Sequence, residues 1–531
     1  IMKEQNNNTE KTRNEESTFS RRSMLKALAG IPVLGFLGYQ VLAKSNYHEK
    51  MKQEAPRILK ALNLDDIEVS VPDITSPSVK GDLIRLGIIG YGTRGVQLAK
   101  SLGFMTPQEV EERKKNNTLE RWYGQQNLKV AITGICEVYD MRAEEGLICA
   151  KNPTHAEREN TKILPVKRYR HYHEMLASDD IDAVIISTPD HHHAQITMDA
   201  VKAGKHVYCE KCFTRTEEEL YRAYDVVKNG NVVFQLGHQI PQNQVFKQAK
   251  EIIRRNILGE IGLIETTTNR NSASGAWIRH LDDDGNLKPG NEQNIDWEQW
   301  LGSRPKVPFS KDRYYNWTKW FDYARGLFSQ LFTHEFDAVN QLLNLGIPST
   351  AVASGGIYHW KDNREMPDVL HAVYEYPERD LSFVYSASLG SSRDRGRLIM
   401  GREGSMDLGW NVNLMIDRKS EKFKEEIEKG IITPGENILT VDSGFEEVDG
   451  VSSATASYYA SRGLIDTTIN GKLVDVTHLH LKEWLNCIRH GGEPSANIET
   501  AFQETVAVHM GHKAYMEKRK VKWDPEKNRI V

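Results

Sequence analysis

The 531-residue sequence has few cysteines, no excess of positive charge and no internal repeat. Lysine and arginine number 69 against 73 aspartates and glutamates, and the resulting net charge of -4 gives no indication of nucleic-acid binding. Five cysteines are too few and too scattered for a disulfide framework: Cys136, Cys149, Cys209, Cys212 and Cys487. With 39% hydrophobic and 27% charged residues, the composition is typical of a soluble globular protein of two or three domains.

A long membrane-spanning run is also missing near the N-terminus. The apolar stretch 27–43 is interrupted by Pro32 and by glycines, and is shorter than the roughly 20 apolar residues that a span needs. The heptapeptide before it, from Ser20 to Lys26, matches the twin-arginine export pattern, with Met24 in place of phenylalanine. We therefore expect an export signal in residues 1–45 and a periplasmic protein. The Ala-x-Ala cleavage signature is poor, so an uncleaved membrane tether and an ordinary buried helix stay open.

The clearest motif present is a glycine turn between a strand and a helix. The apolar run Leu86–Ile89 predicts a buried parallel strand, and Gly90, Gly92 and Gly95 follow it as Gly-x-Gly-x-x-Gly. The first glycine permits a tight turn, the second lets a pyrophosphate approach the backbone, and the third lets helix and strand pack closely. The N-terminus of the helix from Val96 would then bind the phosphates.

Strands and helices alternate after this turn. We expect strands at 129–136, 183–187, 206–209 and 232–236, with a helix at 194–203, and hence a doubly wound parallel sheet. This predicts a linker at 46–82 and a dinucleotide-binding domain of the Rossmann type at 83–240. The second domain, 241–531, has successive strand-like runs that favour an α+β fold with an open, mostly antiparallel sheet. Residues 411–470 show little periodicity and are predicted to be a variable insertion.

Polar residues follow several of the predicted strands. Glu137 and Asp140 end the second strand, where a carboxylate accepts the adenosine ribose hydroxyls and favours NAD over NADP. Arg142 keeps NADP open because arginine can accommodate a 2′-phosphate. Three histidines, 191–193, follow Thr188 and Pro189. They allow contact with cofactor or substrate, or an ordinary loop; we predict no metal site, because no set of Cys, Asp or Glu at ligand spacing accompanies them.

Glu210, Lys211 and Cys212 follow the next strand. A lysine at the carboxyl edge of a parallel strand lies near the reactive ring of a bound cofactor, where its ammonium polarises a substrate oxygen or passes a proton. Cys209 and Cys212 form Cys-x-x-Cys, which usually acts as a redox pair at a helix N-terminus of a different fold. We therefore do not assign a working disulfide.

A last candidate is the helical segment 326–343, where Gln330, His334, Asp337 and Gln341 form one polar stripe. Histidine is the usual general base near neutral pH. Taken alone, however, such a stripe is more typical of a solvated helix face.

Together these motifs resemble the Gfo/Idh/MocA family of sugar and cyclitol oxidoreductases. The resemblance covers residues 84–502 and includes the glycine turn, Thr-Pro-x-x-x-His (188–193), a variant of Glu-Lys-Pro (210–212) and a variant of Asp-x-x-x-His (330–334). Residues 269–271, 294–302 and 316–317 are also similar to exported bacterial members. The resemblance implies a Rossmann domain joined to an open-faced sheet domain, a small sugar or glycoside substrate, and a homodimer or homotetramer.

Two positions depart from the family pattern. The proline of Glu-Lys-Pro is Cys212, and the aspartate of Asp-x-x-x-His is Gln330. A glutamine can bind a sugar hydroxyl but cannot take its proton, so the proton relay would depend on His334 and Lys211. This puts the rate, or the reaction type, in question.

The resemblance and the motifs together give three sets of site residues. The predicted catalytic residues are Lys211, His334 and Gln330. The predicted cofactor-binding residues, for NAD or alternatively NADP, are Gly90, Gly92, Thr93, Arg94, Gly95, Glu137, Arg142, Thr188, Pro189, His193, Glu210, Lys211 and Gln239. The predicted substrate-binding residues are Arg270, Asn271, Trp277, Trp317, Tyr323 and His334.

The leading hypothesis is reversible oxidation of a sugar hydroxyl, with a tightly bound cofactor that is loaded before export. Two alternatives remain open at this point. One is cleavage of a glycosidic bond by transient oxidation with no net redox change, although the relatives of that kind have lost the lysine that is kept here at Lys211. The other is a carbohydrate-binding protein without catalysis.

Overall fold

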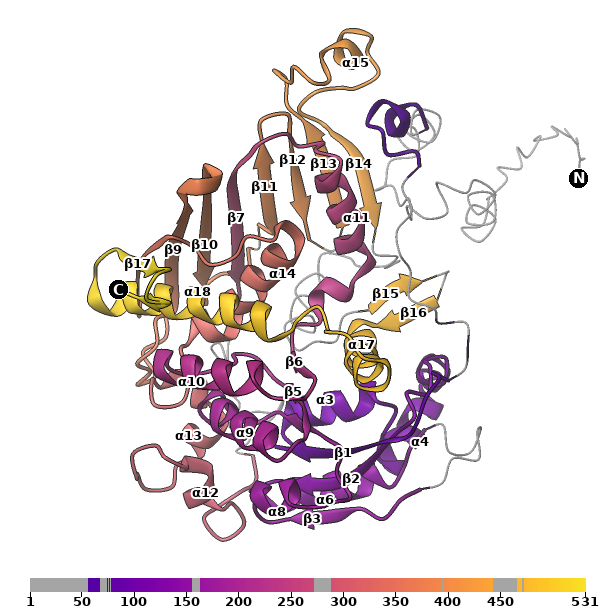
Figure 1. Ribbon diagram of the computed structural model, residues 1–531, viewed down its shortest axis with the longest axis vertical. Coiled ribbons are helices and arrows are strands. Elements are labelled where there is room, and N and C mark those ends of the chain that lie inside the picture. The colour runs from indigo at the N-terminus through magenta and orange to yellow at the C-terminus, as the bar shows by residue number, and fades with distance from the viewer. Residues whose placement is uncertain are drawn as a thin grey trace, which may run out of the picture.

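A computed structural model describes residues 56–66, 74, 76, 78–154, 163–271, 288–393, 395–409, 411–442, 466–469 and 472–531. The predicted export signal and Trp277 lie outside the described residues. The described chain forms two halves, each built on one large sheet (Figure 1). None of the described helices is both long enough and apolar enough to span a bilayer.

The first half contains a six-stranded parallel sheet in the order β3-β2-β1-β4-β5-β6, which confirms the predicted doubly wound fold. Its strands are β1 (Ile84–Ile89), β2 (Val130–Cys136), β3 (Lys167–Tyr169), β4 (Ala183–Ile186), β5 (His206–Cys209) and β6 (Phe234–Leu236). All residues of β2 and β4 are buried, as expected for strands with helices on both faces. Strand β3 was not predicted, because three residues carry too little periodicity.

The helices of this half are α3 (Thr93–Ser101), α4 (Pro107–Lys115), α5 (Leu119–Tyr123), α6 (Asp140–Ala150), α8 (Tyr172–Leu176), α9 (Asp190–Lys202) and α10 (Glu217–Lys228). Helix α9 begins four residues before the predicted Ala194, with Pro189 as its N-cap. The three histidines therefore lie in the first turn of a helix and not in a loop.

The second half contains a ten-stranded sheet in the order β14-β13-β12-β11-β7-β10-β9-β8-β17-β18. Only β7 and β10 pair in parallel, which confirms a mostly antiparallel sheet. Its strands are β7 (Ile261–Asn269), β8 (Thr350–Gly356), β9 (Val369–Tyr376), β10 (Leu381–Ser388), β11 (Arg397–Gly401), β12 (Gly404–Leu408), β13 (Asn411–Ile416), β14 (Asn437–Asp442), β17 (Val521–Asp524) and β18 (Arg529–Ile530). Burial alternates along β10 and β13, so one face of the sheet packs on the core.

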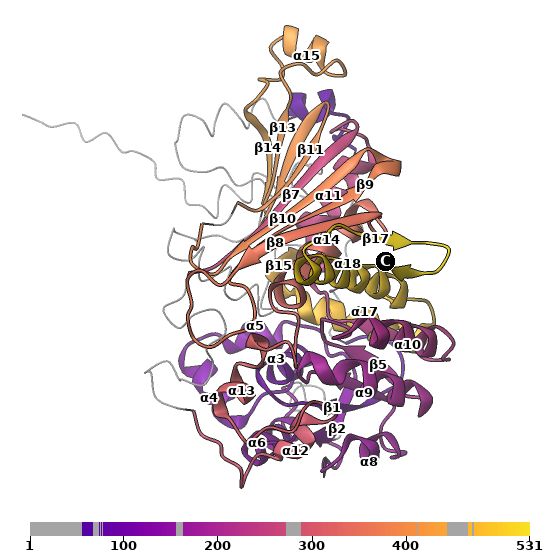
Figure 2. The same ribbon diagram turned by 90° about the vertical axis from the view of Figure 1, so that its left-hand side faces the viewer.

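Helices α11 (Gln244–Arg254), α14 (Thr333–Leu343) and α18 (Ile498–Glu517) lie along one side of this sheet (Figures 1 and 2). One π-helical turn, Phe328–Phe332, leads directly into α14. Further elements are α12 (Trp297–Leu301), α13 (Lys311–Tyr315), α15 (Lys424–Glu428), α17 (Val476–His490), the hairpin of β15 (Asp466–Ile469) and β16 (Lys472–Asp475), and three short 3-10 helices.

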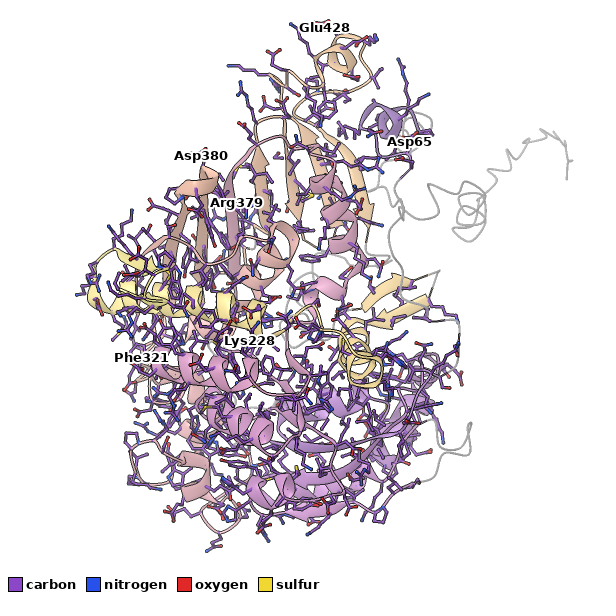
Figure 3. All side chains as sticks on the ribbon, viewed as in Figure 1. Asp65, Lys228, Phe321, Arg379, Asp380 and Glu428 are labelled. Atoms are coloured by element: carbon purple, nitrogen blue, oxygen red, sulfur yellow. The ribbon has the colours of Figure 1, made fainter. Side chains whose placement is uncertain are left out.

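The predicted linker and the predicted variable insertion both contain regular elements among their described residues. Within residues 411–470, β13 and β14 extend the large sheet, and α15 with Glu428 lies at the end of this half that is remote from the parallel sheet (Figure 3). Arg379 and Asp380 lie in the turn from β9 to β10 (Figure 3), where the Arg379 guanidinium donates to the backbone carbonyls of Leu343 and Asn344. Within the predicted linker, residues 56–61 are helical, and Ile58 and Leu59 belong to the main hydrophobic core.

Helix α17 joins the two halves near the C-terminal end of the chain. Its Leu481, Trp484 and Leu485 are buried in the core cluster of the first sheet, and the ring of Trp484 lies 5.7 Å from that of Tyr208 on β5. The backbone N–H of Leu236 on β6 donates to the carbonyl of Ala496 at 2.9 Å. The parallel sheet is therefore completed by residues more than two hundred positions later in the chain.

Asp475 holds the start of α17 in place. Its carboxylate accepts the backbone N–H groups of Thr477 at 2.9 Å and His478 at 3.3 Å, and the hydroxyl of Ser101 at the end of α3. We expect Asp475→Ala to lower the free energy of unfolding by about 1–2 kcal/mol, because an N-cap is lost. Urea unfolding of the full chain measures this. The exposed Asp225→Ala on α10 serves as the control and should change it by less than about 0.5 kcal/mol; an equal effect would contradict the assignment.

Candidate active site

A cavity of about 510 Å³ is lined by residues from both halves of the protein. Most of the predicted cofactor residues line it: Gly90, Gly92, Thr93, Arg94, Glu137, Arg142, Thr188, Pro189, Glu210, Lys211 and Gln239. Gln330, His334 and Trp317 line it from the second half. The structure thus brings the predicted phosphate-binding turn and the predicted catalytic residues to one cavity.

The glycine turn fits a dinucleotide. Gly90 has φ of +88°, and a Cβ there would lie 2.9 Å from the backbone of Ser187 and Thr188. A Cβ on Gly95 would lie 2.4 Å from the carbonyl oxygen of Gly90, so this glycine packs α3 against β1 and does not line the cavity. A Cβ on Gly92 would meet nothing within 4 Å, which leaves the backbone at the N-cap of α3 open to a phosphate.

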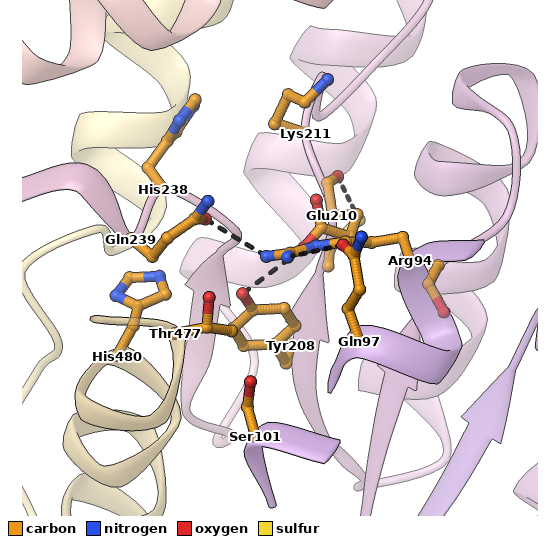
Figure 4. A network of polar contacts seen from close by, with 12 residues as sticks. Arg94, Gln97, Ser101, Tyr208, Glu210, Lys211, His238, Gln239, Thr477 and His480 are labelled. Carbon is orange, nitrogen blue, oxygen red and sulfur yellow. Dashed lines mark hydrogen bonds and ion pairs between the residues drawn. The ribbon is translucent and has the colours of Figure 1, made fainter. Parts of the chain in front are cut away.

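Arg94, in the turn, is held by a buried polar network (Figure 4). Its Nε donates to Oε1 of Glu210 at 2.7 Å, and its terminal nitrogens donate to Gln97 at 3.3 Å and Gln239 at 3.2 Å. Burial and Glu210 also raise the pKa of the Tyr208 phenol well above its usual value. Glu210 and Gln239 thus fix the arginine beside the cavity, where its positive charge would face the cofactor phosphates.

Glu137 is buried at the end of β2. Its two oxygens accept the backbone N–H groups of Tyr91 at 2.6 Å and Tyr139 at 2.9 Å. Burial raises the pKa of this carboxyl, whereas the two backbone donors lower it. Glu137 therefore both braces the glycine turn and faces the cavity where an adenosine ribose would lie.

Asp140 and Arg142, two charged residues near Glu137, form ion pairs with other side chains. Asp140 forms ion pairs with Arg168 and, at 2.8 Å, with Arg170, which lower the pKa of its carboxyl. It does not line the cavity, so the ribose would depend on Glu137. Arg142 lines the cavity and pairs with Glu145 at 3.0 Å on its own helix.

Lys211, Gln330 and Asp190 form one cluster in the cavity wall. Lys211 Nζ donates to Gln330 Oε1 at 3.3 Å, and Gln330 Nε2 donates to Asp190 Oδ2 at 2.9 Å. Asp190 is only 1% exposed, and burial raises the pKa of its carboxyl. Gln330 replaces the aspartate of the family pattern. The carboxylate of Asp190, which comes from the first half of the chain, lies beside it.

His334 faces the cavity from α14. The polar stripe to which it belongs was expected to be solvated, but Gln330, His334 and Asp337 are buried, with exposures of 8%, 8% and 1%. The cause is the first half of the chain, because Lys211 and Asp190 contact Gln330, and His238 contacts His334. Burial, followed by the Lys211 ammonium, lowers the pKa of His334 well below its usual value, so the imidazole is neutral and able to accept a proton.

The three histidines of α9 contact backbone carbonyls, and His192 also lines the cavity. Nε2 of His191 and Nε2 of His192 lie 2.9 and 2.7 Å from the carbonyl oxygen of Trp300. His193, predicted to bind the cofactor, places its two nitrogens 2.7 and 2.8 Å from the carbonyls of Cys212 and Thr188 and does not line the cavity. It shapes the two loops that do.

Three predicted substrate residues lie away from the cavity lining. Tyr323 is fully buried against Trp300 and does not line the cavity, and Arg313 donates to its hydroxyl at 3.1 Å. Arg270 and Asn271 follow β7, where Asn271 is exposed and bridges to Gly390. Trp277 is outside the described residues.

The segment 288–317 covers the cofactor end of the cavity. The N–H of Asp140 donates to the carbonyl of Asn294, and the N–H of Asp296 donates to the carbonyl of Val138, both at 2.9 Å. The segment adds lining residues that the sequence did not predict: Lys288, Gln299, Trp300, Tyr314 and Tyr315. The sequence offers two signals for them, the aromatic density of the stretch and the resemblance of residues 294–302 to exported members, and neither says where the stretch folds back.

The Cys-x-x-Cys pair lies at the end of β5, on either side of Glu210 and Lys211. Cys209 and Cys212 are free and buried, and burial raises the pKa of both thiols. The Lys211–Cys212 peptide bond is cis. Within the described parts of the chain, no group of three or more His, Cys, Asp or Glu side chains is arranged to hold a metal ion.

A parallel Rossmann sheet with a phosphate-binding turn, joined to a sheet domain that supplies a histidine, defines the class of two-domain, dinucleotide-binding oxidoreductases. The comparisons identify the family. Residues 84–238 match the GFO_IDH_MocA model, described as "Oxidoreductase family, NAD-binding Rossmann fold", and residues 300–523 match its C-terminal alpha/beta domain. These matches cover more than half of the chain, which therefore belongs to the Gfo/Idh/MocA oxidoreductase family and carries its NAD-binding domain.

Known dehydrogenases are similar to this chain at modest sequence identity. A levoglucosan dehydrogenase of Pseudarthrobacter phenanthrenivorans is 30% identical over 187 residues, which cover 35% of this chain and 41% of the relative. An inositol 2-dehydrogenase of Salmonella typhimurium is 28% identical over 134 residues, covering 25% and 35%. These matches span less than two thirds of each relative's length. A solved levoglucosan dehydrogenase in complex with NADH and L-sorbose has a TM-score of 0.55 at 17% identity, over 83% of this chain and 99% of that one, which shows the shared fold.

Proposed function

We propose that this protein oxidises a hydroxyl-bearing carbon of a sugar or sugar derivative, reversibly, with NAD. One observation carries the proposal: Lys211, Gln330 and His334 meet in the wall of the cavity whose other end is the glycine turn. The relatives named levoglucosan dehydrogenase and inositol 2-dehydrogenase support a sugar or cyclitol as the substrate class.

The roles of the side chains follow from their chemistry. Neutral His334 accepts the proton of the substrate hydroxyl, and the Lys211 ammonium polarises the same oxygen. Asp190 orients the amide of Gln330, so that its oxygen faces Lys211 and directs the ammonium. When bound, NAD supplies the hydride acceptor.

The preference for NAD over NADP is proposed from Glu137. Its buried carboxyl faces the cavity at the end of β2, and a 2′-phosphate next to this group would be repelled whenever the carboxyl is ionised. Arg142 lines the same region but is paired with Glu145, which reduces its attraction for that phosphate.

We also propose that the cofactor stays bound, that the protein is exported with it, and that copies associate through the sheet domain. Tight binding is supported by segment 288–317, whose backbone pairs with residues 138–140 over the cofactor end of the cavity. Export is supported by the twin-arginine pattern at residues 20–26, and association by the resemblance to dimeric and tetrameric relatives.

The test is to purify the full protein, dialyse it extensively, and identify any nucleotide that acid releases. We expect about one NAD per chain. Levoglucosan, L-sorbose and myo-inositol are then added singly, while absorbance follows reduced nicotinamide and mass spectrometry follows the products. Reduction of bound NAD by one of them supports the proposal. Glycoside hydrolysis without formation of NADH would indicate redox-neutral cleavage. Binding of all three sugars without any change in the cofactor would contradict the proposal that the protein is an enzyme.

A further inference from the structure

A line of buried polar groups leads from His334 away from the cavity to helix α18. Nδ1 of His334 lies 3.4 Å from Nδ1 of His238, whose Nε2 lies 3.3 Å from the hydroxyl oxygen of Thr333. That hydroxyl donates to Oε1 of Glu504. The four groups come from three separate parts of the chain: the end of the first domain, α14 and α18.

The line is closed to solvent at its far end. His238 is 2% exposed, and Thr333 and Glu504 are fully buried. The second oxygen of Glu504 accepts the hydroxyl of the adjacent Thr505 at 2.8 Å. A carboxylate accepts both of these bonds, whereas an amide of the same shape could accept only one of them, because its NH2 group donates.

The ionised carboxylate sets the direction of every bond in the line. Glu504 can only accept, so Thr333 donates to it and in turn accepts from Nε2–H of His238. Nδ1 of His238 then has no proton and accepts from Nδ1–H of His334. This leaves Nε2 of His334 without a proton, which is the tautomer that a base facing the cavity requires.

Protonation of Glu504 reverses the same bonds. Its O–H then donates to Thr333, Thr333 donates to Nε2 of His238, and Nδ1–H of His238 donates to Nδ1 of His334. Nε2 of His334 then carries the proton, as an acid for the reverse reaction requires. The line therefore has two complete hydrogen-bonded states, one for oxidation and one for reduction.

We propose that Glu504 stores the proton that the substrate hydroxyl releases, and that Thr333 and His238 carry it there from His334. This inference rests on the proposed function and extends it. In oxidation, the substrate O–H and the adjacent C–H bonds break and a C=O bond forms. The two electrons of the C–H bond leave with hydride to the bound cofactor, and the hydroxyl proton goes to Nε2 of His334. One proton then moves along each hydrogen bond, and the last neutralises the Glu504 carboxylate.

The groups around the line favour Glu504 as the end point. Burial lowers the pKa of both His238 and His334 well below the usual value, so neither retains the proton. Burial raises the pKa of Glu504 to about 7; Thr333, Thr505 and Lys211 lower it and Asp190 raises it. A carboxyl with this pKa can hold or release a proton near neutral pH.

One other acid faces the line. Oδ2 of Asp337 lies 4.0 Å from Nδ1 of His238, beyond a hydrogen bond, and its two oxygens accept from Gln341 at 2.9 and 3.0 Å. Burial raises the pKa of Asp337 well above its usual value, but no hydrogen bond joins its carboxyl to His238. The Cys212 thiol also interacts electrostatically with Glu504. Burial raises the pKa of this thiol well above its usual value, so it stays neutral. Asp337 therefore does not compete with Glu504.

The first arm of the test measures the protonation of Glu504 in the absence of any sugar. Infrared spectra of the purified holoprotein are recorded against pH, and the carbonyl band of a protonated carboxylic acid is followed. We expect a band that grows as the pH falls through about 7 in the wild type and is missing in E504Q. Thr505→Val should move this band to higher pH, because the donor that lowers the pKa is lost. A wild-type spectrum without this titration would overturn the proposal, whatever the fate of the proposed function.

The second arm measures transfer with whichever sugar of the panel reduces the bound cofactor. Wild-type oxidation should rise as the pH rises through about 7, because Glu504 must be ionised to accept. E504Q and T333V should each slow the reduction of bound NAD by about 100-fold and lose this pH step, whereas T333S, which keeps a hydroxyl, should restore both. Wild-type rate and pH profile in both E504Q and T333V would overturn the relay. If no sugar is oxidised, the proposed function fails, but the first arm still decides whether Glu504 takes up a proton near neutral pH.

Discussion

Replacing His334 by alanine is expected to lower the rate at which a sugar reduces bound NAD by about 100- to 10,000-fold. The side chain lines the cavity and is neutral because it is buried next to Lys211, so its removal leaves the substrate hydroxyl without a base. The NAD content should be unchanged, since the glycine turn is untouched. Stopped-flow absorbance of the purified holoprotein measures the rate, and acid extraction measures the nucleotide.

The matched control is His371→Ala. His371 is exposed on β9, where its ring bonds to Ser386, and it does not line the cavity. This variant should react like the wild type. Full activity of the His334→Ala protein on a substrate that the wild type oxidises would remove His334 from the mechanism. Equal loss in both variants would indicate a general effect of mutation.

The second large effect concerns the glycine turn, where two similar substitutions should have different results. Gly95→Ala places a methyl group 2.4 Å from the backbone oxygen of Gly90, so α3 must move away from β1. We expect it to lower the free energy of unfolding by about 1–3 kcal/mol and to abolish retention of the nucleotide. Urea unfolding and nucleotide extraction are the measurements.

Gly92→Ala should behave differently, because its added methyl group meets no protein atom within 4 Å. Unfolding should be unchanged, but the methyl group occupies the approach of the phosphate to the N-terminus of α3. The loss of hydrogen bonds worth ~1.5–3 kcal/mol to a charged group corresponds to a nucleotide affinity about 10- to 100-fold lower. Unchanged nucleotide affinity would show that the phosphate does not lie against Gly92.

Local patterns were sufficient to predict the framework of this protein. A buried strand, a glycine turn and a helix follow one another within about twenty residues, so their geometry depends on neighbours in the sequence. The same holds for Glu137 and Lys211, because the carboxyl ends of parallel strands meet at one edge. The parallel sheet and the position of these residues at its carboxyl edge were therefore accessible from sequence alone.

The polar stripe shows why other parts of the site could not be predicted from the sequence. Its periodicity correctly predicts a helix face, but the residues that contact this face, Asp190, Lys211 and His238, lie 96 to 140 positions earlier in the sequence. Asp190 was overlooked for a related reason. It follows a strand as predicted, but its role depends on Gln330, which is brought to it only when the second half folds onto the first. Contacts between distant segments leave no periodic signal in either of them.

Helix α17 has a consequence for the order in which the chain acquires its structure during synthesis. The core of the parallel sheet contains Leu481, Trp484 and Leu485, so the ribosome must complete more than nine tenths of the chain before that core can close. Domains usually fold in sequence from the N-terminus as they emerge. Here the first domain must wait for the last helices, and a fragment that ends at residue 240 would expose an apolar surface at the place of α17. The two halves therefore fold as one unit, although the strands of the first are all synthesised by residue 236.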